Sequence, residues 1–407
     1  MTGPVAPLRL LAAVWCLCAG ASHGAPPKAD SETKETDEIA ANLKRTDRTR
    51  MVRDLGFIKD INALRERWND RIGFDYGVTY HAFTSAAMLG DGTPTGTAGD
   101  LTLQGIWAPG KNWRENPWEL HFRMRYRHAI GDTAPSDLRG EIGSLWGVTD
   151  GFTDAGFEVP NFFFRKVYPR LGIELRFGQM TIDDQFDSHA LRGAKQSYLN
   201  QAFSSDPAVA FPRFGAGFTI EKKFKNGLAI TLGASTVQGT QNGKQVDIKA
   251  NSSDMFEAVQ LAYDFKSPSD RASRVQLLAW HSDAVEADGT PEGKGVSFTI
   301  EQELKGHDLR AFARAAWAEG TATPVDKLFS AGLAWQLREK DLLGLAAGIG
   351  RGSGSGHPIQ AVVEGFYRIQ IREGLRISPD FQILMGEGFH GAPGTRVVAG
   401  LRAGFDF

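Results

Sequence analysis

Hydrophobic and polar residues alternate along most of the chain, and the alternation is clearest at its C-terminal end. The apolar positions there are Val397, Ala399, Leu401, Ala403, Phe405 and Phe407. The positions between them are Arg396, Val398, Gly400, Arg402, Gly404 and Asp406. A period of two residues is typical of a β-strand with one apolar face and one polar face. This period holds from about residue 72 to the end of the chain, which predicts an all-β fold.

Sixteen segments with this period follow one another between those limits. Each is about 9 to 13 residues long, the length that crosses an outer membrane at a tilt of ~45°. We expect strands at residues 73–84, 100–108, 117–128, 157–168, 171–181, 214–224, 227–237, 254–265, 272–282, 294–304, 308–318, 329–338, 342–350, 360–371, 374–384 and 395–407.

The connections between these segments alternate in length. Short turns occur at residues 169–170, 225–226, 305–307, 339–340 and 373, and long links occur at 129–156, 182–213, 238–253 and 283–293. Short periplasmic turns and long extracellular loops are typical of outer-membrane barrels. A soluble protein of several β-sandwiches would also alternate, but it has no reason to alternate its loop lengths. The sequence therefore predicts a 16-stranded antiparallel transmembrane β-barrel over residues 72–407.

The first 24 residues have the pattern of a secretory signal peptide. A single cation, Arg9, precedes an apolar stretch from Leu10 to Ala19, and small residues follow. The chain has two cysteines, Cys16 and Cys18, and both lie in this segment. We therefore expect an exported protein whose mature chain has no disulfide.

Two further segments precede the predicted barrel. Residues 25–50 are polar and mixed in charge, which indicates a periplasmic tether. From residue 51 to residue 71 the apolar positions recur every three or four residues, at Leu55, Ile58, Ile61, Leu64 and Trp68. This spacing predicts a short amphipathic helix. Its apolar face could cap the bottom of the fold or contact the barrel mouth, another subunit or the cell wall.

Composition excludes several other classes of protein. Gly accounts for 47 of the 407 residues, and the formal net charge is only -2. A nearly neutral chain has no general attraction for nucleic acid, so we expect no nucleic-acid partner. Outside the N-terminus there is no apolar run near the ~20 residues that a membrane helix needs.

Charged residues recur on the polar faces of the predicted strands. Arg at the bilayer midplane costs about 2 to 4 kcal/mol on the lipid side, so these residues must face the lumen. The candidate pore-lining residues are Glu119, Arg123, Arg125, Arg127, Glu174, Arg176, Arg310, Arg314, Glu364, Arg368, Asp380 and Gln382. A wall with many donors and acceptors suits a neutral sugar or polyol. The arginine row at 123, 125 and 127 could instead select anions such as organic acids.

The link at residues 182–213 is long enough to fold into the pore. Its candidate constriction residues are Asp183, Asp184 and Asp187, together with Phe203 and Phe211. The same link could also form an extracellular lid that never enters the lumen.

Motifs for catalysis and cofactor binding are missing from the sequence. Beyond the expected signal peptide it contains no G-x-S-x-G, no HExxH and no histidine pair at metal-ligand spacing. The Gly-rich segment at 351–357 has no Lys, which argues against a nucleotide site. We expect no enzyme, no metal and no cofactor, and a purely structural or adhesive barrel is a remote alternative.

Three stretches resemble the carbohydrate-selective porin family (OprB-like). They are residues 178–221, residues 328–350, and residues 363–385 with the closing strand. The third is the most specific, because Glu364, Tyr367, Pro379, Asp380 and Gln382 match the family pattern over two neighbouring strands. The resemblance implies a sixteen-stranded pore for passive diffusion of sugars or polyols across the bacterial outer membrane, narrowed by inward loops. The expected partners are these permeants, outer-membrane lipid and the barrel assembly machinery, which would engage the strand ending at Phe407. Homo-oligomerisation stays open.

Overall fold

The computed structural model describes residues 56–89, 92–109, 118–238, 243–248, 254–266, 272–285, 289–304, 309–338, 340–372, 374–388 and 393–406. The expected signal peptide (1–24), the expected tether (25–50), the first residues of the expected helix (51–55) and Phe407 lie outside these ranges.

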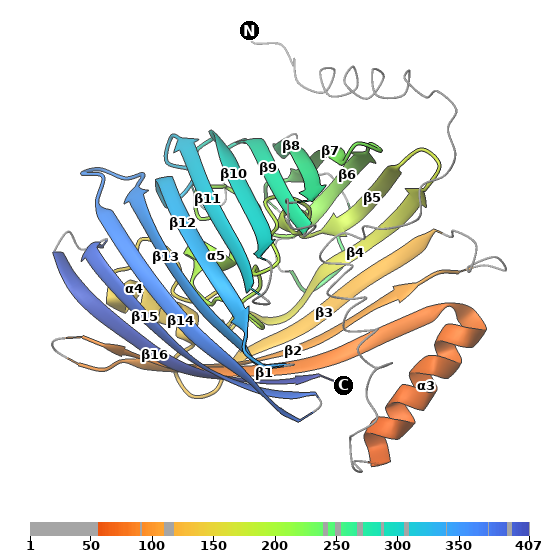
Figure 1. Ribbon diagram of the computed structural model, residues 1–407, viewed down its shortest axis with the longest axis horizontal. Helices are drawn as coiled ribbons and strands as arrows, with labels where there is room; N and C mark the ends of the chain where they lie inside the picture. Colours follow the sequence, from red (N-terminus) through yellow and green to blue (C-terminus); the bar gives the residue numbers. More distant parts are fainter. Residues whose placement is uncertain are drawn as a thin grey trace, which may run out of the picture.

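Sixteen antiparallel strands form a closed barrel in which each strand pairs with its neighbours in sequence (Figure 1). The strands are β1 (Phe74–Met88), β2 (Thr95–Trp107), β3 (Glu119–Ala129), β4 (Gly156–Tyr168), β5 (Ile173–Met180), β6 (Gly215–Lys223), β7 (Leu228–Thr236), β8 (Met255–Lys266), β9 (Ala272–Ser282), β10 (Gly293–Leu304), β11 (Leu309–Glu319), β12 (Val325–Gln336), β13 (Leu342–Gly352), β14 (Ile359–Arg372), β15 (Leu375–Glu387) and β16 (Pro393–Asp406). The first and last strands pair from Thr79 with Asp406 to Met88 with Val397, which closes the sheet. The predicted fold is confirmed.

Two strands begin four or five residues earlier than predicted, and β1 ends at Met88 rather than at residue 84. β2 begins at Thr95 rather than residue 100, because its polar, Gly-containing start still pairs with the end of β1. β12 begins at Val325 rather than residue 329, and a register shift between Val325 and Lys327 interrupts its pairing with β13. A bulge of this kind breaks the period of two and hides the start of a strand from a search for alternation.

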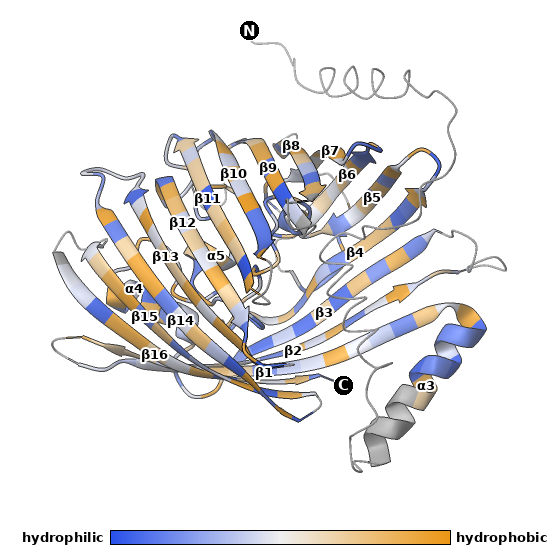
Figure 2. Ribbon diagram, in the orientation of Figure 1, coloured by the Kyte–Doolittle hydropathy of each residue, from blue (hydrophilic) through white to orange (hydrophobic). Residues whose placement is uncertain are grey.

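Alternate side chains along each strand lie on opposite faces of the barrel wall. On β9, β10 and β11 the apolar residues Leu277, Phe298 and Trp317 are exposed on the outside. Their polar neighbours Gln276 and Thr299 are buried on the inside. The bands of hydrophobic and hydrophilic colour along the strands show the same alternation (Figure 2). The outer face is thus the apolar one.

The helical elements lie before the first strand and in the links between strands. α3 (Gly56–Ile72) precedes β1. The link between β3 and β4 contains η3 (Pro135–Asp137) and α4 (Leu138–Ile142), and the link between β5 and β6 contains η4 (Ile182–Gln185) and α5 (Gln201–Ser204). Among the described residues, no helix is long and apolar enough to cross a membrane.

Both of these links fold into the barrel and form a hydrophobic core with its wall. Trp146, Tyr198 and Phe203 from the links pack with Phe312 of β11 and Phe366 of β14 in one buried cluster. The Tyr198 ring lies edge-on to Phe366, with the centroids 5.0 Å apart. The barrel is therefore partly filled on the β11–β16 side, and its open space lies elsewhere.

We predict that replacing Phe298 with Arg destabilises the barrel by about 2 to 4 kcal/mol, because the charge would enter the lipid face in the middle of β10. Urea-dependent unfolding in lipid vesicles measures this free energy. Gln104→Arg on β2 is the matched control, because Gln104 lines the aqueous interior. Equal costs at the two positions would contradict the assigned orientation of the strands.

Candidate pore constriction

The long link between β5 and β6, residues 181–214, crosses the lumen and is called the constriction loop below. Its Tyr198 hydroxyl lies within hydrogen-bond distance of two carbonyl oxygens on the opposite wall, at 2.5 Å from Leu333 on β12 and 2.9 Å from Leu345 on β13. These strands are far from β5 and β6 in the order of the barrel. The loop therefore spans the interior and is no extracellular lid.

Carboxylate and amide side chains of β14 and β15 hold the middle of the loop. Glu364 accepts hydrogen bonds from the backbone N–H groups of Leu199 at 2.6 Å and Asn200 at 3.0 Å. The Asn200 amide donates to Gln382 at 2.9 Å, and its carbonyl oxygen accepts from the Trp146 indole at 2.6 Å. Asn200, Glu364 and Gln382 are fully buried. Because buried polar groups are costly without partners, these bonds fix the position of the loop.

A buried ion cluster holds a second part of the loop against β10 and β11. The Arg314 guanidinium lies 2.9 Å from Asp187 and 3.6 Å from Asp206. The Thr299 hydroxyl donates to Asp187 at 2.6 Å and the Ser297 hydroxyl donates to Asp206 at 2.9 Å. Removing one partner from such a cluster would leave an uncompensated charge in the interior.

Additional polar contacts tie the loop to the rest of the wall. Arg368 of β14 donates to the Gln196 carbonyl at 2.9 Å, and Arg402 of β16 donates to the Ser197 carbonyl at 2.9 Å. Lys195 forms an ion pair with Asp100 of β2 at 2.7 Å. The loop is thus held from many directions, and its shape is set by the whole barrel.

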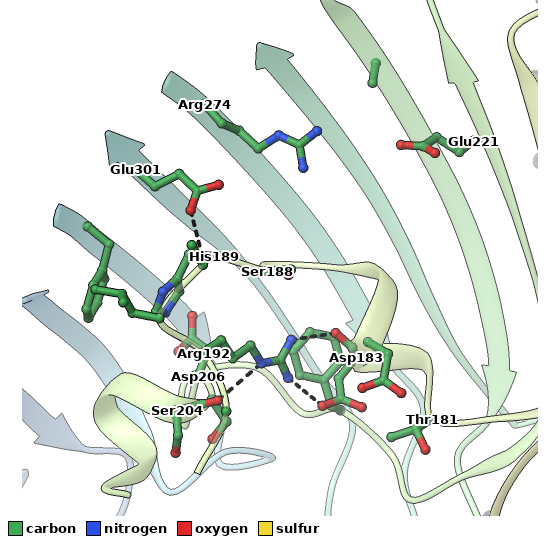
Figure 3. A pocket seen from close by; sticks show the side chains of 18 of the residues that line it. Thr181, Asp183, Ser188, His189, Arg192, Ser204, Asp206, Glu221, Arg274 and Glu301 are labelled. Atoms are coloured by element: carbon green, nitrogen blue, oxygen red, sulfur yellow. Dashed lines mark hydrogen bonds and ion pairs between the residues drawn. The ribbon is translucent and has the colours of Figure 1, made fainter. Parts of the chain in front are cut away.

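A cavity of about 1980 Å³ lies beside the constriction loop and extends to the end of the barrel where the short turns lie, such as the turn between β4 and β5. Figure 3 shows part of it, with Arg192 of the loop reaching Asp183 and with Glu221, Arg274 and Glu301 projecting from the strands opposite. Arg192 and Asp183 are 2.5 Å apart. This cavity is the candidate path for a solute.

The structure divides the residues proposed from the sequence into two groups. Seven of them line the cavity: Arg123, Arg125, Arg127, Glu174, Arg310, Asp183 and Asp184. The others are described but lie away from its lining: Glu119, Arg176, Arg314, Glu364, Arg368, Asp380, Gln382 and Asp187. Most of this second group joins the constriction loop to the barrel wall through the contacts described above. These residues are Glu364, Gln382, Arg314, Arg368 and Asp187. Phe211 lines the cavity, whereas Phe203 is buried in the hydrophobic core.

Glu158 is not among the residues predicted from the sequence, although it lies at the centre of a group of arginines beside the cavity. Its carboxylate lies 2.9 Å from Arg125, 2.6 Å from Arg127 and 2.8 Å from Arg213. Glu158 itself is only 1% exposed. It lies in the apolar run of β4, where a register shift in the pairing with β3 aligns it with Arg125. A lone acid in an apolar strand was the available signal, but the bulge that aligns it is a tertiary feature.

Burial changes the acidity of two carboxyl groups in the constriction loop. Burial raises the pKa of Asp183 to about 6; the Arg192 guanidinium opposes the shift, and Asp184 adds to it. Burial likewise raises the pKa of Asp206 to about 6, against the effect of Arg314. Both groups therefore change charge at mildly acidic pH.

Several solved structures have the same architecture as this chain. The solved structure of Pseudomonas putida OprB at high pH matches with a TM-score of 0.70 and 14% sequence identity, over 86% of this chain and 97% of that chain. The low-pH structure of the same protein matches with a TM-score of 0.56 and 12% identity over the same shares. A triple mutant of Rh. blastica porin matches with a TM-score of 0.50 and 13% identity, over 82% of this chain and 100% of that one. At these identities the matches show the fold.

The family comparison decides the identity. The sequence profile of the OprB family, described as carbohydrate-selective porins, matches residues 116–407. The chain belongs to the OprB family. It is therefore a carbohydrate-selective porin of the outer membrane, a channel and not an enzyme. No curated protein matches it.

We predict that Glu364→Ala loosens the constriction loop of this porin. The substitution removes the acceptor of two buried backbone N–H groups, at a cost of about 1 to 3 kcal/mol for each group left unpaired. Planar-bilayer recordings should show a larger and noisier conductance. Glu221→Ala is the control, because Glu221 lines the cavity and pairs with Lys223 on its own strand. An unchanged conductance trace for Glu364→Ala would show that this anchor is dispensable.

We also predict that acidification makes the porin more anion-selective. Both Asp183 and Asp206 are ionised above their raised pKa values of about 6 and neutral below them, so lowering the pH from about 7 to about 5 removes negative charge beside the passage. Reversal potentials in a salt gradient measure the shift. Asp183→Asn with Asp206→Asn should reduce it, whereas Asp132→Asn on the exposed extracellular link should not. A full shift in the double variant would assign it to other groups.

Proposed function

We propose that the porin passes neutral sugars or polyols by passive diffusion through the cavity beside the constriction loop. The observation that carries this proposal is the balance of charge on the cavity wall. Among the described residues, thirteen basic and eleven acidic side chains line it, so neither sign dominates. Such a wall offers donors and acceptors to a hydroxylated solute without retaining a counter-ion.

The charged groups of the wall are also largely paired with one another. Arg123 lies 3.4 Å from Asp184, and Arg165 lies 2.8 Å from Glu174. Arg310 lies 2.8 Å from Glu303. Paired charges attract free ions less than isolated charges do, but their remaining donors and acceptors still replace the hydration of a sugar hydroxyl. In this proposal Arg123, Arg125, Arg127, Glu174, Arg310, Asp183 and Asp184 touch the permeating solute.

We predict that vesicles containing the porin swell in isotonic monosaccharide, more slowly in disaccharide, and little in a larger oligosaccharide. The reason is that the constriction loop narrows a path whose wall binds hydroxyl groups. Light scattering of liposomes measures the swelling rate, and vesicles without protein are the control. Vesicles that swell in salts but in no neutral sugar would overturn the proposal.

Transport of anionic solutes such as organic acids is the second candidate. It is favoured by Glu158, which neutralises only one of the three arginines around it. Under this alternative, reversal potentials shift toward the anion, and Arg123→Ala with Arg125→Ala abolishes the shift. Neutral-sugar transport instead predicts a weak selectivity that changes little in this double variant.

Four finer proposals concern the export, the assembly and the partners of the chain. We propose that residues 1–24 direct export and are removed, and that the assembly machinery recognises the last strand, β16. The apolar outer face supports contact with outer-membrane lipid. Homo-oligomerisation is a further candidate.

A further inference from the structure

The helix α3 is fixed against the start of β1 on the outside of the barrel (Figure 1). Arg65 forms an ion pair with Asp75 and is itself buried. The Trp68 ring lies 5.7 Å from Phe74 and 5.8 Å from Tyr76, measured between centroids. The helix is therefore docked through its last turns, and this part is positioned by the barrel.

The aromatic residues that Trp68 contacts belong to the outer face of the barrel. Phe74 stacks on Phe122 of β3, with centroids 5.7 Å apart and an interplanar angle of 10°. Phe74 also pairs in register with Trp107 of β2, which is exposed on the outside. Aromatic girdles of this kind mark the level of the membrane–water interface.

This group lies at the periplasmic end of the barrel. β1 begins at Phe74, and the strands that start or end at the same level are joined by short turns such as the one between Tyr168 and Ile173. The long links leave the opposite end. Because short turns are periplasmic in outer-membrane barrels, α3 lies at the level of the inner leaflet.

The docked part of α3 still presents an apolar stripe that the described residues leave uncovered. Trp68 is 40% exposed and Ile72, one helical turn later, is 52% exposed. Arg67 and Arg71 are exposed and follow one edge of this stripe. Glu66 is exposed on the far side of the helix. One side of the helix thus carries Trp next to Arg, and the opposite side carries an acidic residue. This pattern is typical of a helix that lies in the plane of a lipid interface.

We propose that α3 is an interfacial helix that binds the phospholipid headgroup layer of the inner leaflet of the outer membrane. Trp68 and Ile72 enter the boundary between headgroups and acyl chains, and Arg67 and Arg71 bind lipid phosphates. Lipid is the occupant because the exposed stripe is continuous, through Phe74 and Tyr76, with the lipid-facing surface of the barrel. The helix would thus hold the periplasmic end of β1 at a fixed depth in the membrane.

The experiment uses the lack of cysteine in the chain after Cys18. Ile72→Cys and Glu66→Cys, each in the full mature chain, are labelled with an environment-sensitive fluorophore and folded into vesicles of phosphatidylcholine and phosphatidylglycerol. Both positions are exposed, so the label displaces no packed side chain. Gel mobility without heating checks that both variants fold.

The proposal expects opposite quenching at the two positions. Brominated acyl chains should reduce the fluorescence at Ile72→Cys, and aqueous iodide should reduce the fluorescence at Glu66→Cys. Adding Arg67→Gln with Arg71→Gln should lower the lipid quenching at Ile72→Cys, because the phosphate contacts are lost. Quenching of both positions by iodide alone would place the helix in water and overturn the proposal. Protection of Ile72→Cys from both quenchers would point to a second copy and would also overturn it.

Discussion

Lipid offers the polypeptide backbone no hydrogen-bond partner, and the architecture of this protein follows from that constraint. Every N–H and C=O group inside the bilayer has to pair within the protein, so strands can cross only as a sheet without edges. The pairing of β1 with β16 removes the last edge. Closure then creates an interior that is separated from lipid, and each strand needs side chains of opposite character on its two faces.

The enclosed interior imposes a second requirement, because polar and charged groups inside it have to be paired. The constriction loop supplies many of the partners. Glu364 accepts hydrogen bonds from two of its backbone N–H groups, and Arg314 pairs with its Asp187 and Asp206. The contacts that pair the polar groups of the wall also hold the loop across the lumen. The narrow part of the pore therefore depends on the same interactions that stabilise the barrel. The passage that we propose follows the cavity, where charged groups of the wall pair with each other, as Arg165 does with Glu174.

The N-terminal helix shows how the two environments meet at the rim. Arg65 is paired with Asp75 beside the first strand, whereas Trp68 continues the aromatic surface of the outside. The last turns of one helix thus combine an internal ion pair with an apolar face, and the order of the residues around its axis decides which side each one faces.

The amino-acid sequence by itself determined the barrel, its strand number, its antiparallel order and the apolar outside, because a period of two and alternating loop lengths are local properties of the chain. It also determined which residue types lie inside. It did not distinguish Arg123, which lines the cavity, from Arg314, which is buried under the loop, because both occupy inward positions of strands and differ only in what packs above them. It likewise could not align Glu158 with three arginines across a bulge. Only the tertiary structure decided these assignments, because the path of the constriction loop depends on contacts with strands up to about half the barrel away, and no local pattern records them.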